Sequence, residues 1–347
     1  MEDKVNMLEL MLRPAFCVHK GQISQVNREA SRYLLAVGTP ILDLLLTGQE
    51  EYAALEEGCL CLTLRIEDHE FAASAIKQGD HSIFVLEQDA IHAHLQSLAL
   101  VAQEMREPLA GMMSAADRMQ SAAPNEDMAQ MNRRLYQMLR LVGNMSDAAR
   151  FTTQKAPAEW VDIDALLREI FAKAIPLSAQ SGKTLCYTGL QEHIYTLAND
   201  QLIERAVYNL ISNAMKYSPK GSTIEAKLVK SGRFLRFTVE DPGCGISADI
   251  QGNLFSRYMR NPGLEDPTHG LGLGLLLVRL AASTHGGTVL IDHPHENGTR
   301  VTMTLAICQE SHATVRSPRL RIDYAGERDH ALVELSDVLD ASVYQNI

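Results

Sequence analysis

Apolar residues recur every three or four positions from residue 91 to residue 119 without a break. This spacing predicts a long helix with one apolar stripe, as in coiled coils. The run SAAPNED (121–127) supplies a turn and an acidic helix start, and a second stripe follows from residue 128 to residue 149. One helical hairpin cannot bury both stripes, so we predict that two chains pair into a four-helix bundle, as a homodimer.

The region before the hairpin alternates strand-like runs with turns. A turn at KGQ separates two short apolar runs and predicts a β-hairpin, which the helix-like run REASRYLLAV follows. Three further strands are predicted at CLCLTLRI, EFAASAI and HSIFVLEQ. This order, with a last strand that runs into a long helix, resembles a PAS sensory domain. A small α+β domain of another class is the alternative, and no residue pattern identifies a ligand.

The region after the hairpin begins with a linker-like run, TTQKAPAEW (152–160), and then alternates helices and strands up to Cys308. The last forty residues contain two strand-like runs, RLRIDY and HALVELSDVL, around a GERD turn. They predict either a hairpin added to the preceding domain or a partly disordered segment. Their pattern indicates no function.

Charge and cysteine content narrow the classes of partner and compartment. The net charge of -11 argues against the backbone of a nucleic acid as the main partner. The six cysteines are scattered without a CxxC pair, which is typical of a reducing compartment. No window reaches the roughly 18 apolar residues of a membrane span, and no signal-peptide pattern is present. We therefore predict a cytoplasmic protein without a membrane span.

A polar stripe occurs in the predicted helix AVYNLISNAMKYSP. Asn209, Asn213 and Lys216 follow one another at i, i+4 and i+7 and so share one helix face. Two amides and an ammonium group on one face can coordinate a hydrated Mg²⁺ ion and contact phosphate oxygens. A solvated helix face would give the same pattern, so the stripe alone does not decide the function.

A predicted strand ends at Asp241, and Gly243 and Gly245 follow it in the run FTVEDPGCGIS. A carboxylate at a strand end can accept a hydrogen bond from the exocyclic amine of adenine, and the glycines permit a close approach. An ordinary Asp-Pro-Gly turn is the alternative explanation.

A third motif, THGLGLGLLLVRLA, places three glycines at the start of an apolar helix: Gly270, Gly272 and Gly274. Backbone N–H groups and the positive end of a helix dipole can bind phosphate at such a position. The motif is not a Walker A loop, because it lacks the GK[ST] sequence.

The three motifs together resemble the N, G1 and G2 boxes of the GHKL nucleotide-binding fold of sensor histidine kinases. The run LFSRYMR (254–260) resembles the F box, and THGGTVLI with NGTRVTMTL resembles the closing strands. The resemblance covers about residues 90–308. It implies an α/β sandwich that binds ATP and Mg²⁺ beneath a lid at roughly 253–272.

The resemblance also implies roles for individual side chains. Asn213 would bind Mg²⁺, and Asn209 would support that site. Lys216 would face phosphate, Tyr217 would line the nucleotide pocket, and Asp241 would hold adenine. Relatives that hydrolyse ATP carry a glutamate base where Asn209 stands, and an amide cannot take a proton from water. Hydrolysis of ATP is therefore disfavoured.

The glycines and two arginines complete the implied site. Gly243 and Gly245 would shape the adenine pocket. Gly270, Gly272 and Gly274 would form the lid hinge and the phosphate loop, and Arg257 and Arg260 in the lid are candidates for phosphate contacts.

The run QEMREPL, which begins at Gln103, resembles the H box His-Glu-x-Arg-x-Pro-Leu of the dimerisation and phosphoacceptor domain. Gln103 occupies the position of the phosphoacceptor histidine, and its amide is neither nucleophilic nor basic. Glu104 keeps the position of the H-box carboxylate, whereas Glu107 replaces the Thr or Asn that orients a dephosphorylating water. His92 and His94 lack the surrounding motif.

The sequence thus predicts a multidomain α+β protein. Its predicted parts are a PAS-like sensory domain (1–88), a helical-hairpin dimerisation domain (89–155), a GHKL α/β sandwich ATP-binding domain (156–308) and a C-terminal tail (309–347). The main hypothesis is a nucleotide-binding but degenerate histidine kinase, with a response regulator or a partner kinase as a further partner. One alternative is an active kinase that phosphorylates another site or a partner chain, and another is a dimeric scaffold that binds no nucleotide.

Overall fold

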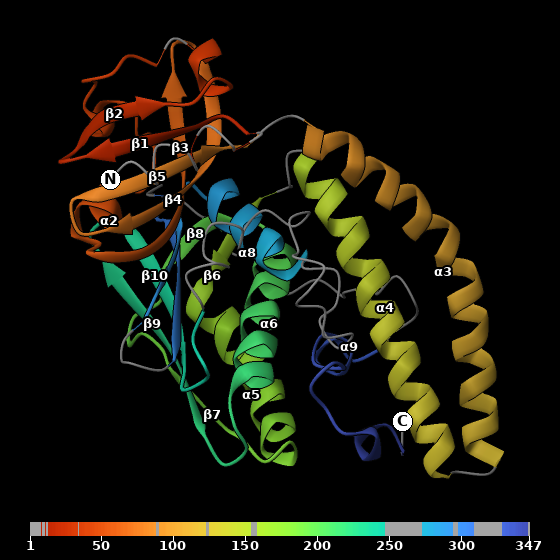
Figure 1. Cartoon of the computed structure of the whole chain (residues 1–347). Helices are drawn as coiled ribbons and strands as arrows, with labels where there is room; N and C mark the ends of the chain where they lie inside the picture. Colours follow the sequence, from red (N-terminus) through yellow and green to blue (C-terminus); the bar gives the residue numbers. More distant parts are fainter. Residues whose placement is uncertain are drawn as a thin grey trace.

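A computed structural model provides the structure of the protein. It describes residues 8, 11, 13–33, 35–87, 90–122, 125–153, 158–246, 273–293, 298–308 and 328–345. The fold is mixed α+β, with a ten-stranded sheet on one side and a long helical hairpin on the other (Figure 1).

The N-terminal strands agree with the sequence prediction. They are β1 (Ala15–His19), β2 (Gln22–Val26), β3 (Glu57–Ile66), β4 (His69–Gln78) and β5 (His81–Leu86), all antiparallel to their neighbours in the order β2-β1-β5-β4-β3.

The helix predicted at residues 28–37 is wrong, because only a 3-10 turn, η1 (Ala30–Tyr33), forms there. The backbone beyond it pairs with β2: the Gly38 N–H donates to the carbonyl of Ile23, and the Ile23 N–H donates to the carbonyl of Thr39. These groups are therefore not available for a helical ladder. Two short helical segments that the pattern did not predict follow, η2 (Ile41–Asp43) and α2 (Gln49–Ala54).

The predicted helical hairpin is present as α3 (Ala90–Ala122) and α4 (Glu126–Thr153). Along α3 every second residue of the apolar stripe is buried: Leu95, Ala102, Leu109 and Ala116. The alternate positions are less covered, and the side chain of Met112 is 45% exposed. Among the described helices, none combines the length and apolar character needed to cross a membrane.

The C-terminal part forms an α/β sandwich. Its strands are β7 (Thr184–Thr188), β9 (Thr223–Ser231), β10 (Phe234–Asp241), β11 (Val289–Asp292) and β12 (Thr299–Ala306), in the order β11-β12-β10-β9-β7. β7 and β9 are parallel and the other pairs antiparallel. A separate pair joins β6 (Glu159–Asp162) and β8 (Tyr195–Ala198).

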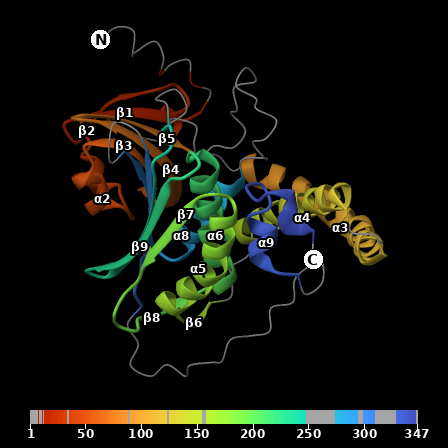
Figure 2. The same cartoon turned by 90° about the horizontal axis from the view of Figure 1, so that it is seen from below.

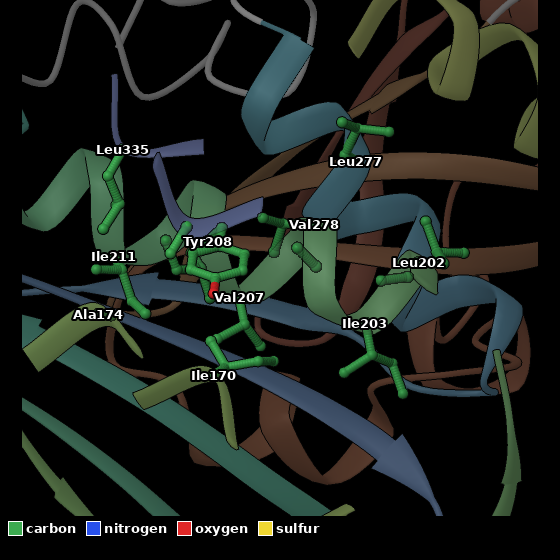
Figure 3. Packing of buried hydrophobic residues seen from close by; sticks show 14 of the residues in the cluster. Ile170, Ala174, Leu202, Ile203, Val207, Tyr208, Ile211, Leu277, Val278 and Leu335 are labelled. Carbon is green, nitrogen blue, oxygen red and sulfur yellow. The ribbon is translucent and has the colours of Figure 1, made fainter. Parts of the chain in front are cut away.

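Three helices share one hydrophobic cluster with the strands of this sandwich: α5 (Ile163–Gln180), α6 (Asp200–Tyr217) and α8 (Leu273–Thr284). Figure 3 shows side chains of all three meeting around Tyr208, which is fully buried. Asn199 fixes the start of α6, because its side-chain oxygen accepts from the N–H of Leu202 at 2.8 Å.

The N-terminal and C-terminal strands form one continuous sheet, because β3 pairs with β11. Leu60 lies opposite Leu290 in this antiparallel pair. Gly58 fits only as glycine there, since a Cβ would lie 2.6 Å from the carbonyl oxygen of Ile291 and its φ is +147°. A buried ion pair between Arg279 of α8 and Glu87 further joins the two parts. No sequence pattern predicts these contacts, because both members of each pair lie far apart in the chain.

The strand predicted at HALVELSDVL is wrong, since this segment contains a helix, α9 (His330–Glu334), followed by turns and a 3-10 helix, η4 (Ala341–Tyr344). Asp329 caps α9 by accepting from the N–H of Ala331 at 2.8 Å. Ala331, Leu335 and Leu339 are buried at a spacing of four, the period of a helix rather than a strand. The predicted run RLRIDY lies outside the described residues. Figures 1 and 2 both show α9 between the hairpin and the sandwich helices.

Candidate functional site

The polar stripe predicted for α6 is present on that helix, and its exposure increases toward the C-terminal end. Asn209 is 1% exposed, Asn213 and Lys216 are half-buried, and Tyr217 is 44% exposed. The stripe therefore begins in the core and reaches solvent where the helix ends. This arrangement suits a ligand that approaches the C-terminal end of α6.

Contacts on both sides fix the amide of Asn209. Its Nδ2 donates to the carbonyl of Arg205 at 2.8 Å, and its Oδ1 accepts from the guanidinium of Arg140 at 3.2 Å. Gly274, the second residue of α8, lies against the same amide: a Cβ there would be 2.7 Å from Asn209 Oδ1. Gly274 is thus required for the close packing of α8 on α6. Gly270, Gly272 and the predicted lid lie outside the described residues.

Asp241 ends β10 as predicted, and Gly243 holds it close to α6. The Gly243 N–H donates to Asp241 Oδ1 at 2.9 Å. A Cβ on Gly243 would lie 2.5 Å from that oxygen and 2.8 Å from the carbonyl oxygen of Tyr217. The glycine therefore brings Tyr217 and Asp241 together. Gly245 adopts φ +73°, a left-handed conformation that favours glycine.

The environment of Asp241 changes its acid–base behaviour. The residue is 7% exposed. Burial raises its pKa to about 6, although the Gly243 N–H lowers the pKa and the charge of Glu240 raises it further. At neutral pH the group is still an anion, but one that water solvates poorly. Such a carboxylate is a strong hydrogen-bond acceptor for an amine donor.

The side chains of the degenerate H box lie on the exposed surface of α3. Gln103, Glu104 and Glu107 are all exposed. Arg106 instead turns toward α4 and donates to the hydroxyl of Ser146. Beside this site lies an apolar groove, whose lining includes Glu104 together with Leu100, Val101, Met105, Pro108, Leu109, Met112 and Met138.

A buried charge cluster next to Asn209 was missed by the sequence interpretation. It joins Arg140 of α4 and Arg205 of α6 to Glu334 of α9, with side-chain exposures of 7%, 7% and 2%. No local spacing could reveal it, because its members come from three separated segments. The one signal in the sequence is Arg140, a charged residue close to the apolar stripe of the second hairpin helix.

Comparison with known proteins shows which proteins this chain is similar to. Residues 198–308 match the family described as histidine kinase-, DNA gyrase B- and HSP90-like ATPase. The chain is 29% identical over 226 residues to the sensor protein KdpD of Clostridium acetobutylicum, covering 61% of this chain and 24% of that protein. It is 26% identical over 253 residues to the sensor-like histidine kinase SenX3 of Mycolicibacterium smegmatis, covering 68% and 65%.

Residues 198–308 therefore form a histidine kinase-like ATPase domain. Both relatives are sensor kinases, and the chain is similar to them in sequence. It spans less than two thirds of the length of both relatives. Among solved structures, full-length ShkA in complex with AMPPNP shares the fold, with a TM-score of 0.51 and 21% identity over 62% of this chain and 47% of that one.

Proposed function

We propose that this chain is a two-component signalling protein that binds Mg·ATP but does not phosphorylate itself at the usual acceptor position. Two observations carry the proposal: the C-terminal end of α6, with Asn213, Lys216 and Tyr217, lies next to the buried Asp241, and the acceptor position holds an exposed glutamine, Gln103. The similarity to sensor kinases supports the signalling class.

The residues of the sandwich fit a nucleotide. Asp241 is a desolvated carboxylate in a glycine-lined position, and it would accept a hydrogen bond from the amine of adenine. The half-buried amide of Asn213 would ligate Mg²⁺ through its oxygen, and the ammonium of Lys216 would meet a phosphate. Tyr217 would line the pocket, and Asn209 would support the metal site. Bound Mg²⁺ would neutralise phosphate charge.

The acceptor position lacks the chemistry of phosphoryl transfer. A histidine would attack phosphorus through its unprotonated ring nitrogen, while a neighbouring carboxylate takes the other ring proton. Glu104 supplies that carboxylate, but the Gln103 amide nitrogen has no available lone pair. Glu107 stands four residues later, where an orienting Thr or Asn is expected. We infer that both phosphoryl steps toward a response regulator are impaired, and that signalling proceeds through conformation and nucleotide occupancy.

The exposed side of the hairpin supports a homodimer. The alternate stripe residues that α4 does not cover include Met112 and Met119, which are 45% and 56% exposed. Met131 of α4 and Leu100 of α3 are also exposed, at 38% and 67%. An apolar surface of this kind along a coiled-coil seam is typical of an interface with a second copy of the same hairpin. The resulting four-helix bundle would place the groove beside Gln103 at the junction of two chains.

Two further observations concern the N-terminal domain and the compartment. The N-terminal strands and their connection to α3 support a PAS-like sensory role. The six cysteines are all free thiols, which supports a reducing compartment such as the cytoplasm.

The proposal is tested by incubating the full chain with Mg²⁺ and γ-labelled ATP, followed by acid treatment. We expect binding of Mg·ATP by calorimetry but no acid-labile label on the native chain. Gln103→His should gain acid-labile label, whereas Gln103→Asn, which exchanges one amide for another, should not.

Each outcome separates the hypotheses. Acid-labile label on the native chain would show an active kinase with another acceptor, and label on an added partner would show transfer in trans. Absence of any Mg·ATP binding would favour the scaffold. An unlabelled Gln103→His variant that still binds Mg·ATP would contradict the inference that one missing imidazole blocks the reaction.

A further inference from the structure

The described C-terminal segment, residues 328–345, lies beyond the matched ATPase domain, which ends at residue 308. It packs against both the hairpin and the sandwich. Leu335, Leu339 and Tyr344 are fully buried, and Leu335 belongs to the same hydrophobic cluster as Ile211 of α6 (Figure 3). The rings of Tyr344 and Tyr136 of α4 lie 5.0 Å apart. The segment is thus held by contacts with two other parts of the chain.

Side chains of α4 bind the backbone of this segment. Gln137 donates to the carbonyl of Ser336 at 3.2 Å, and Arg133 donates to the carbonyls of Ser336 and Asp337, each at 3.3 Å. These carbonyls belong to the turn that follows α9. Arg328 adds an ion pair with Asp117 of α3. The hairpin therefore recognises a particular conformation of the segment.

Charged groups continue this interface into the nucleotide domain. Glu334 pairs with Arg205 of α6 and lies 3.7 Å from the guanidinium of Arg140. Asp337 pairs with Arg140 at 2.6 Å, and Asp147 of α4 pairs with Arg205 at 2.7 Å. Two arginines and three carboxylates thus meet where α4, α6 and α9 come together. Glu334 and the two arginines are nearly fully buried, so loss of one charge would leave the others poorly compensated.

The cluster reaches the nucleotide site through Arg140. The same guanidinium that pairs with Asp337 donates to Asn209 Oδ1, and that oxygen lies against Gly274 at the start of α8. An Asn209 amide held in this way cannot turn toward a bound metal or phosphate. The state with the segment bound and the state with nucleotide bound therefore require different contacts of one amide.

We propose that residues 328–345 are an intramolecular clamp that fastens the ATPase domain to the hairpin through the Glu334 and Asp337 contacts with Arg140 and Arg205. Clamping competes with nucleotide binding. The competition rests on the proposed binding of Mg·ATP, whereas the clamp itself does not. Because coupling between two sites is reciprocal, weakening the clamp raises nucleotide affinity, and bound nucleotide loosens the clamp by the same factor.

The test uses Asp337→Asn in the full-length chain. Asp337 is the most exposed carboxylate of the cluster, with a side-chain exposure of 32%, so this variant is the least disruptive choice. Asp340→Asn is the matched control, because Asp340 lies on the same segment, is exposed, and makes no side-chain cap hydrogen bond to η4. Glu334→Gln is a second, stronger variant. Hydrogen exchange of the α9 and α4 peptides measures the clamp, and calorimetry with Mg·ATP measures affinity.

We expect Asp337→Asn to increase hydrogen exchange in α9 at least threefold and to tighten Mg·ATP binding by a similar factor, with no change in Asp340→Asn. Saturating Mg·ATP should increase the same exchange in the native chain. Unchanged exchange in both Asp337→Asn and Glu334→Gln would overturn the clamp. Faster exchange with unchanged Mg·ATP affinity would overturn the competition alone. If no variant binds Mg·ATP, the proposed function fails, and the exchange data still decide whether the clamp exists.

Discussion

Asp241→Asn separates the stability of the protein from its proposed function. The carboxyl is 7% exposed, and burial raises its pKa from the ordinary 3.8 to about 6. Since a change of one pKa unit corresponds to about 1.4 kcal/mol, the ionised group costs the fold about 3 kcal/mol at neutral pH. The folded-state pKa lies above the unfolded one, so the cost is present above pH 6 and disappears as the pH falls toward 3.8.

The amide introduced by this substitution would keep the hydrogen bond that matters to the fold, because an amide oxygen can accept from the Gly243 N–H as the carboxylate does at 2.9 Å. We therefore expect Asp241→Asn to stabilise the protein by about 1–3 kcal/mol at pH 7.5, and by about half as much at pH 5. Mg·ATP affinity should fall by about 10–100-fold, because an adenine amine would lose a charged acceptor. In the native chain, affinity should also fall as the pH drops through about 6 and Asp241 is protonated.

Thermal unfolding at pH 7.5 and pH 5, together with calorimetric titration of Mg·ATP, measures both effects. The matched control is Asp164→Asn, a carboxylate of equal exposure. Burial raises the pKa of Asp164, but hydrogen bonds from Tyr187, Arg168 and the N–H of Leu190 together hold it below its usual value. That change should lower the melting temperature. A lower melting temperature for Asp241→Asn at pH 7.5, without dependence on pH, would refute the reasoning.

Two further predictions concern packing and assembly. Gly274→Ala should destabilise the protein by about 1–2 kcal/mol in denaturant unfolding, because overpacking against Asn209 outweighs the gain in helix propensity. Gly111→Ala, where a Cβ meets no atom within 4 Å, should instead stabilise the protein by about 0.5–1 kcal/mol, and equal effects of the two changes would contradict the packing argument. Met112→Glu should convert the homodimer to a monomer in light scattering, whereas Val37→Glu, at a residue 67% exposed outside the hairpin, should not. A native chain that is already monomeric would disprove the predicted bundle.

The elements with a strong period or a clear cap were predictable from the sequence. The two long helices of the hairpin follow their apolar stripes, and the helix that carries Asn209 and Asn213 appears where its pattern predicts. Errors occurred where the pattern was short. Residues 28–37 have a helical composition, but the backbone that follows them, at Gly38 and Thr39, pairs with β2. The run at 330–339 has a strand-like composition, although its buried positions are four apart.

The sequence by itself determined the residue types available for chemistry: the amides and carboxylate of the nucleotide motifs, and a glutamine in place of the acceptor imidazole. These motifs depend on the spacing of residues close together in the sequence, so they can be identified without the structure. The tertiary structure alone decided that β3 extends the nucleotide-domain sheet through β11, and that Glu334 reaches Arg140 and Arg205. Backbone pairing at a sheet edge is nearly independent of side-chain identity, and buried charges are compensated by whichever partner the fold brings within reach. Contacts of this kind produce no repeating pattern in the sequence, because they depend on which residues the fold brings together in space.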